Sequence, residues 1–304
     1  MSVKLKIRKL AWVLKNSIKV FYKKFDVIFI LDSAKASIML AKLARIPKIV
    51  GGDLFFLGYD IKDPVTRYYT DKIVLPKDQN NMHVAIRYQT IIKSFFNIYN
   101  NSLPVLPDSK KYYQEVKKLI KNKSKLNVVV CVKGSKNSPH IWNIENFKKV
   151  ILLIDEYFNH GISFYLVGSK ENFDYSQNAV VSSNVYNICG KTSLLGLREF
   201  LKLTDLLISV DTGVVHVAAT TEINIISIAS SADSINRVRT ISSKAVSIHK
   251  KYHCGPCILK RNIKNFKCKG YLYPECLKQI KPEEVTKEAI KVLDPIYKNL
   301  PYIL

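Results

Sequence analysis

The second half of the chain alternates short apolar runs with amphipathic stretches. The runs are bounded by polar and turn residues, and they predict buried strands at residues 127–132, 163–167, 185–188, 206–210 and 223–228. Apolar positions that recur every three or four residues predict helices at 143–157, 194–203, 214–219 and 282–293. Strands that alternate with helices are typical of a parallel, doubly wound α/β sheet.

The first part of the chain follows the same alternation. It begins with an amphipathic helix predicted at residues 7–25, in which lysines separate the apolar positions. Further elements are strands at 26–31, 47–52 and 71–75 and helices at 34–44 and 83–99. A proline-bearing linker at 103–109 then precedes a basic helix at 110–121. The pattern therefore predicts two domains, residues 1–109 and 110–304.

Composition indicates a globular protein. Hydrophobic residues make up 47% of the 304 positions, yet no apolar run approaches the roughly 18 residues of a membrane span. The N-terminus is basic and lacks the continuous apolar core of a secretory signal. We therefore expect the protein to stay in the cytoplasm.

The charge balance narrows the range of partners. Lys and Arg number 48 against 24 Asp and Glu, a formal net charge of +24. Such a charge favours anionic partners: nucleic acid, a phosphorylated glycolipid or an acidic membrane. A solvated basic surface in a lysine-rich chain has the same composition, so charge alone does not choose among them.

The strongest candidate chemistry follows the predicted strand 206–210. Asp211 ends the strand, Thr212 can cap the next helix, Gly213 lets a ligand approach the backbone, and His216 lies one turn inside that helix. Ligands of open α/β sheets bind beyond the carboxyl ends of strands, and N–H groups at a helix start suit a phosphate. An ordinary connection in which Asp211 only caps the helix accounts for the same residues.

Several motifs then occur in a fixed order. They are the segment 134–147, Val167-Gly168-Ser169-Lys170-Glu171, Gly190-Lys191-Thr192-Ser193-Leu194, Asp211-Thr212-Gly213-x-x-His216-x-Ala218-Ala219, Cys254-Gly255-Pro256-Cys257 through Cys276, and Pro282-Glu283-Glu284-Val285. Together they resemble glycosyltransferase family 9, the bacterial lipopolysaccharide heptosyltransferases. The resemblance runs from about Phe25 to Leu293.

The resemblance implies a GT-B-type α/β fold with two Rossmann-like doubly wound domains facing a cleft. It implies transfer of a heptose or related sugar from a nucleotide-sugar, typically ADP-heptose, to a lipopolysaccharide core or related surface glycan. The transfer would invert the anomeric centre and use no metal or other cofactor. Partners would be the donor, the anionic core acceptor and the anionic inner face of the inner membrane, where the protein would bind peripherally, with no nucleic acid.

The resemblance also implies which residues form the site. Donor binding would fall to Lys136, His140, Gly168, Glu171, Thr192, Asp211, Thr212, Gly213 and His216. On the acceptor side, His83 and Arg87 lie one turn apart on the predicted helix 83–99.

This chain departs from the family pattern in two places. The family has a basic residue two positions before the tryptophan, near the donor phosphates; here that position is His140, and Lys136 is the nearest substitute. The family also begins with a strand and a Gly-Asp turn that supplies the aspartate base. This sequence starts after that point, so we expect an incomplete first sheet and Asp32 as the substitute base, and His140 completes the expected catalytic pair.

The cysteines allow two interpretations. Cys254, Cys257, Cys268 and Cys276 are spaced C-x2-C-x10-C-x7-C, which four thiolates of a structural zinc site could adopt. Clustered cysteines in a cytoplasmic protein are also compatible with free, partly buried thiols that pack a loop, and we favour this second interpretation.

Two rival functions remain at this point. A nucleic-acid-binding protein would explain the charge and the cysteines, but not the Asp211–His216 turn. A catalytically impaired relative that binds nucleotide-sugar or glycolipid without turnover would explain the missing family aspartate.

Overall fold

The computed structural model describes residues 3–31, 35–52, 66–76, 82–98, 105–121, 126–134, 141–257 and 274–299, with side chains from residue 11 onward. The chain divides into two compact units. One comprises Met1–Ser102 with Asn236–Val238, and the other comprises Leu103–Ile235 with Arg239–Leu304. None of the described helices is long and apolar enough to cross a membrane.

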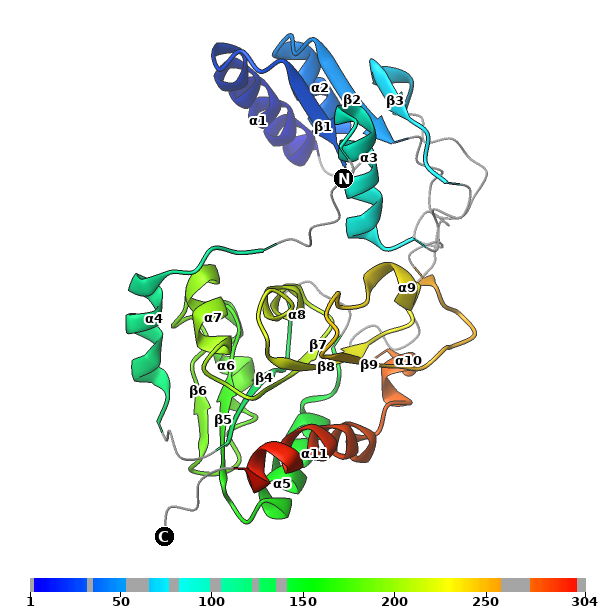
Figure 1. Cartoon of the computed structure of the whole chain (residues 1–304). Helices are drawn as coiled ribbons and strands as arrows, with labels where there is room; N and C mark the ends of the chain where they lie inside the picture. Colours follow the sequence, from blue (N-terminus) through cyan, green and yellow to red (C-terminus); the bar gives the residue numbers. More distant parts are fainter. Residues whose placement is uncertain are drawn as a thin grey trace. The chain divides into compact units, whose positions relative to one another are not determined.

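The first unit is built on a parallel sheet with the strand order β1-β2-β3. Its elements are α1 (Val3–Tyr22), β1 (Val27–Ile30), α2 (Lys35–Leu43), β2 (Lys48–Gly52), the 3-10 turn η1 (Thr66–Tyr68), β3 (Asp71–Ile73) and α3 (Val84–Phe96) (Figure 1). Alternate residues of β1 face opposite sides of the sheet. Ile30 packs with α2, whereas Phe29 packs with Phe95 of α3.

The second unit contains a six-stranded parallel sheet. Its elements are α4 (Lys110–Val116), η2 (Lys117–Leu119), β4 (Leu126–Cys131), α5 (Ile144–Tyr157), β5 (Ile162–Leu166), η3 (Lys170–Asn172), α6 (Phe173–Gln177), β6 (Val185–Asn187), α7 (Leu194–Leu201), β7 (Leu206–Val210), α8 (Gly213–Ala218), β8 (Asn224–Ala229), α9 (Ile235–Val238), β9 (Ala245–His249), α10 (Glu275–Lys278) and α11 (Pro282–Lys298). The strands lie in the order β6-β5-β4-β7-β8-β9. Counted from β4, this is 3-2-1-4-5-6, the order of a Rossmann sheet.

That strand order creates a switch point between β4 and β7. The chain leaves β4 toward β5 and β6 on one side and returns to β7, β8 and β9 on the other. In such sheets the crevice for a ligand opens beyond the carboxyl ends of the two central strands. The predicted doubly wound parallel sheet is thus confirmed, and its switch point lies where Asp211 follows β7.

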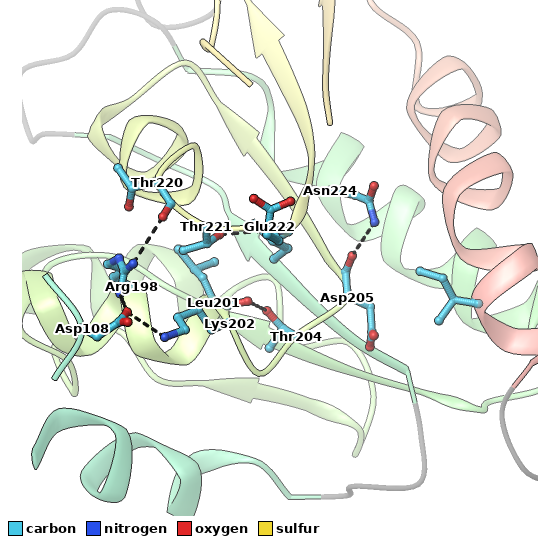
Figure 2. Close-up of a pocket in the computed structure, with 12 residues that line it drawn as sticks. Asp108, Arg198, Leu201, Lys202, Thr204, Asp205, Thr220, Thr221, Glu222 and Asn224 are labelled. Atoms are coloured by element: carbon cyan, nitrogen blue, oxygen red, sulfur yellow. Dashed lines mark hydrogen bonds and ion pairs between the residues drawn. The ribbon is translucent and has the colours of Figure 1, made fainter. Parts of the chain in front are cut away.

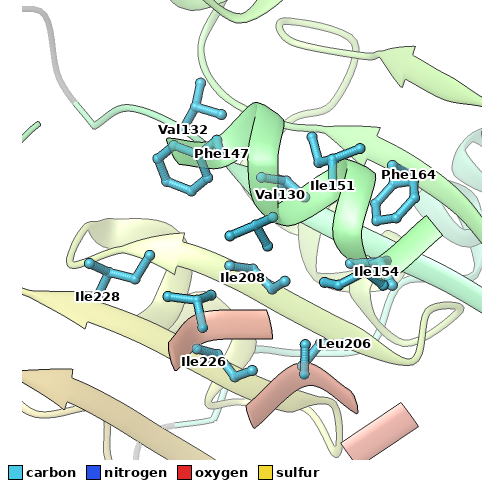
Figure 3. Packing of buried hydrophobic residues seen from close by; sticks show 14 of the residues in the cluster. Val130, Val132, Phe147, Ile151, Ile154, Phe164, Leu206, Ile208, Ile226 and Ile228 are labelled. Atoms are coloured by element: carbon cyan, nitrogen blue, oxygen red, sulfur yellow. The ribbon is translucent and has the colours of Figure 1, made fainter. Parts of the chain in front are cut away.

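Both faces of this sheet are buried, which explains the uninterrupted apolar runs of its strands. Val128 and Val130 of β4 face α5 and α11, where Phe147 and Ile151 pack against them (Figure 3). Val129 and Cys131, which alternate with them, face α7 and α8 on the other side.

Several details of the sequence prediction differ from the structure, and two of the differences have a clear physical cause. The predicted helix 110–121 turns into the 3-10 segment η2 after Val116. Strand β9 was missed because polar Ser247 and His249 interrupt its apolar pattern on an edge strand. Helix α11 continues through Pro295 to Lys298 instead of ending near Leu293, because Tyr297 packs on Phe158, with ring centroids 5.1 Å apart, and holds the last turn in place.

Candidate functional site

The candidate site lies at the carboxyl edge of the six-stranded sheet. Cys131 of β4 pairs with Ser209 of β7, so the residues that follow each strand emerge side by side. Asp211 directly follows β7, and its N–H donates to the Ile228 carbonyl of β8 at 3.0 Å. The aspartate is therefore held in place by the sheet.

The turn after β7 is shaped by its own polar groups. Thr212 is extended, and its hydroxyl accepts a hydrogen bond from the Val214 N–H at 3.3 Å, which caps α8. Gly213 is exposed, and a Cβ added to it would meet no atom within 4 Å. Because α8 has only six residues, a phosphate here would be held by individual N–H groups more than by a helix dipole.

Charges around the turn act on Asp211. Burial raises the pKa of its carboxyl group, His216 opposes that rise, and Asp233 adds to it. Asp233 follows β8 and was not among the predicted site residues. His216 is exposed on α8.

Cys131, the last residue of β4, hydrogen-bonds to the turn through its thiol. Burial raises the pKa of its thiol to about 11, although hydrogen bonds with the Ser209 and Thr212 side chains lower it. The thiol therefore stays protonated at neutral pH, which removes it from the candidates for a nucleophile.

The loops after β5 and β6 meet at the same edge. The Gly190 N–H donates to the Gly168 carbonyl at 2.9 Å, which ties the two predicted glycine turns together. Glu171 is exposed and Thr192 is half-buried in these loops.

Asn172 is a site residue that sequence reasoning missed. It is 4% exposed, and its side-chain amide donates to the carbonyls of Gly134 at 2.9 Å and Lys133 at 3.3 Å. It thereby joins the loop after β5 to the start of the loop after β4. Its place next to Glu171 in the family-like segment was the only signal in the sequence.

Several predicted residues lie outside the described part of the chain. They are Asp32, Lys136, His140 and Cys268. His83 and Arg87 belong to the first unit, where the His83 Nδ1 caps α3 by accepting from the Ala85 N–H at 3.1 Å. Both are 9% exposed, one helical turn apart as expected.

The described cysteines of the C-x2-C segment lie close together. The Sγ atoms of Cys254 and Cys257 are 3.9 Å apart, and Cys276 is buried and accepts a hydrogen bond from the Ser231 N–H at 3.5 Å. Within the described ranges, no three His, Cys, Asp or Glu side chains are grouped to hold a metal. The zinc site, which needs Cys268, stays a prediction.

A cavity of about 520 Å³ lies at the opposite edge of the sheet, before β7 and β8. Figure 2 shows Asp108 bound by Arg198 and Lys202 at this cavity. The Lys202 Nζ is 2.8 Å from Asp108, and Arg198 also contacts Glu199 at 3.0 Å. Both cations are already paired with carboxylates. We therefore interpret them as structural contacts that hold linker residue Asp108 to α7.

Comparison with known proteins decides the family. The model of the family described as glycosyltransferase family 9 (heptosyltransferase) matches residues 15–267, well over half of the chain. The chain belongs to glycosyltransferase family 9. It is accordingly an enzyme of glycosyl transfer.

Two curated relatives of this family 9 glycosyltransferase come from Campylobacter jejuni subsp. jejuni, and both are named lipooligosaccharide heptosyltransferase 2. The protein of serotype O:6 (strain 81116 / NCTC 11828) is 25% identical over 235 residues, which cover 75% of this chain and 69% of the relative. The protein of serotype O:2 (strain ATCC 700819 / NCTC 11168) is 24% identical over 233 residues, with coverage of 75% and 68%.

Solved structures establish the fold of this family 9 glycosyltransferase. The E. coli ADP-heptose LPS heptosyltransferase II matches with a TM-score of 0.70 and 17% identity, covering 94% of this chain and 82% of that one. A family 9 glycosyl transferase from Veillonella parvula DSM 2008 gives 0.68 at 16% identity, with coverage of 95% and 78%. The fold is the expected GT-B type with Rossmann-like units.

Proposed function

We propose that this family 9 glycosyltransferase transfers a heptose from ADP-heptose to a lipopolysaccharide core or related surface glycan. The names of its relatives support the sugar and the acceptor class. The single observation that carries the donor site is the Asp211–Gly213 turn: it stands at the switch point, within a family motif, with open space over Gly213.

The reaction is a single displacement that inverts the anomeric centre. The acceptor hydroxyl oxygen attacks the anomeric carbon, and the bond from that carbon to the diphosphate oxygen breaks. Its electron pair leaves on ADP, and the hydroxyl proton passes to a general base. No metal is required, because N–H groups and basic side chains stabilise the developing diphosphate charge.

We assign the roles of individual residues from the family motifs in which they lie. Thr212 and Gly213 offer backbone N–H groups to the diphosphate, and Asp211 accepts hydrogen bonds from sugar hydroxyls. Lys136, His140 and His216 supply positive charge to the phosphates. Glu171 and Thr192 border the donor from the neighbouring loops. Gly168 keeps the loop after β5 close to them.

The first unit would serve the acceptor. Asp32, the residue after Leu31 at the end of β1, is the proposed base, and His83 and Arg87 the proposed contacts to the anionic core. The net charge of +24 supports peripheral binding at an anionic membrane face, where each basic residue near the surface contributes about 1 kcal/mol.

A transfer assay tests this proposal. Product is followed by mass spectrometry with ADP-heptose and a truncated-core acceptor, presented either in anionic vesicles or in neutral detergent. We expect heptose addition by the wild type, a loss of about 10²-fold or more in Asp32→Asn, and a fall with salt only for vesicles. Wild-type turnover by Asp32→Asn would refute the base, and salt-independent transfer in vesicles would refute electrostatic docking.

A further inference from the structure

Two buried side chains hold the start of the loop after β4: the Cys131 Sγ donates to the Lys133 carbonyl at 3.5 Å, and Asn172 contributes two further hydrogen bonds. Asn172 ends the 3-10 turn η3, and its own N–H donates to the Ser169 carbonyl at 3.0 Å. Its Nδ2 group carries two hydrogens, and it meets two consecutive carbonyls, those of Lys133 and Gly134. Both hydrogens are therefore used on this one stretch of backbone.

The contact between Asn172 and the Lys133 carbonyl also determines the direction of the Gly134 N–H. In a trans peptide, the C=O and the N–H point in opposite directions. The Lys133 carbonyl faces Asn172, which follows β5, so the Gly134 N–H of the same peptide faces away from Asn172. Since β4 lies between β5 and β7, we expect this N–H to be directed to the β7 side of the loop, where the turn at Asp211 lies.

We propose that Asn172 is a positioning residue for donor binding: it orients the Lys133–Gly134 peptide so that the Gly134 N–H joins the Thr212–Gly213 turn in holding a nucleoside diphosphate. This proposal rests on the proposed function, since it adds a contact to the same donor site. Successive backbone N–H groups that converge on one point form an anion site without charged side chains.

The surroundings of Asn172 explain why the residue must be an asparagine. A Cβ added to Gly168 would lie 3.4 Å from the Asn172 Cβ, so the side chain fits closely against the loop after β5. An aspartate has the same shape but cannot donate to either carbonyl. It would also place a negative charge beside two carbonyl oxygens and near the bound phosphates.

Three variants test the proposal. Asn172→Ala removes the two hydrogen bonds, and Asn172→Asp keeps the volume while removing the donors. Asn184→Ala is the matched control, because the Asn184 amide also makes two bonds, to the Ile162 carbonyl at 2.9 Å and to Asp155 at 2.7 Å, but at the opposite edge of the sheet. Both alanine variants should lower the melting temperature.

ADP binding by calorimetry separates positioning from packing. We expect the Kd for ADP to rise about 5- to 100-fold in Asn172→Ala and at least as much in Asn172→Asp. Asn184→Ala should bind within about twofold of wild type, as expected of a distant site. Near-wild-type binding by Asn172→Asp, or equal losses in the two alanine variants, would overturn the proposal.

A ligand-free measurement keeps this test separate from the proposed function. The Gly134 amide signal in an ¹⁵N spectrum should shift in Asn172→Ala and stay in place in Asn184→Ala, whatever the protein binds. A shift without ADP binding by the wild type would count against the donor site alone. An unmoved Gly134 signal would overturn the positioning role.

Discussion

Three glycines shape the carboxyl edge, and they do so for different reasons. Gly190 has a φ of +76°, and a Cβ there would come within 2.8 Å of the Lys170 Cα, so the fold itself requires glycine. A Cβ on Gly168 would meet the Cys189 Sγ at 3.3 Å. Of the three, only Gly213 faces open space. The fold therefore does not require a glycine there, and we attribute its lack of a side chain to access for a ligand.

The ionised carboxylate of Asp211 should lower the free energy of unfolding. Burial raises the pKa of its carboxyl group in the folded state, so the folded protein holds this proton more readily than the unfolded chain. The cost is absent below the unfolded pKa of about 3.9 and is fully present above the raised pKa. A neutral group of the same shape would avoid it.

Asp211→Asn should therefore melt higher than wild type at pH 7, by about 1–3 °C for a protein of this size. The difference should shrink as the pH is lowered toward 4. Calorimetric melts across pH 4–8 measure it. A lower melting temperature of Asp211→Asn at pH 7 would mean that the carboxylate stabilises the fold, and this reading of its burial would be wrong.

At the scale of elements, the linker into the second unit is fastened by charges. Asp108 is held by Lys202 and Arg198, and the Ser109 N–H donates to Glu199 at 3.1 Å. The hydrogen bonds from Lys202 and Arg198 lower the pKa of Asp108 to about 2. Its contribution is thus present above the unfolded pKa of about 3.9 and is lost as the pH falls through about 2.

Breaking this anchor should loosen the start of α4. In Asp108→Ala the ion pairs that hold residue 108 to Arg198 and Lys202 are lost. We therefore expect the hydrogen bond from the Ser109 N–H to Glu199 to open more often, and the Ser109 amide to exchange its hydrogen several-fold faster. The control is Glu222→Ala, at the rim of the same cavity and paired with Lys244 at 3.1 Å. Equal exchange in Asp108→Ala and wild type, or an Asp108 titration midpoint near 3.9 by NMR, would contradict the anchor.

The elements also show where sequence reasoning succeeds. Strand β7 was predicted residue for residue, and β4, β5, β6 and β8 were predicted to within one residue at each end, because their apolar runs are bounded by polar residues and both faces of the sheet are buried. Edge strand β9 was missed since it is half-exposed and mixed in character. Helix α11 was predicted too short because Pro295 ends most helices, and the contact of Tyr297 that sustains it is not local.

At the scale of the whole molecule, the parallel doubly wound sheet was predictable because strands and helices alternate along the sequence. The family was predictable because its motifs occur in the expected order. Asp211, Thr212 and Gly213 were found because they share one motif at one strand end. Asn172, Cys131 and Asp233 were not, because each acts through a neighbour that is distant in sequence. The cavity at Asp108 was also missed, because it forms where linker residue Asp108 meets Arg198 of α7, which lies 90 residues later in the sequence.

The central claim is that the donor binds at the carboxyl edge of the second sheet and not in the cavity at the other edge. Calorimetric titration of ADP-heptose into wild type, Gly213→Val and Lys202→Ala decides this. In Gly213→Val the added Cβ meets no atom within 4 Å outside its own turn, so we expect the side chain to obstruct a ligand while the fold stays in place. Lys202→Ala changes the lining of the cavity and removes one of the two cations that hold Asp108.

We predict that Gly213→Val weakens binding at least about tenfold, equivalent to about 1.4 kcal/mol, while Lys202→Ala binds like wild type. Wild-type affinity in Gly213→Val, with binding lost in Lys202→Ala, would contradict the account.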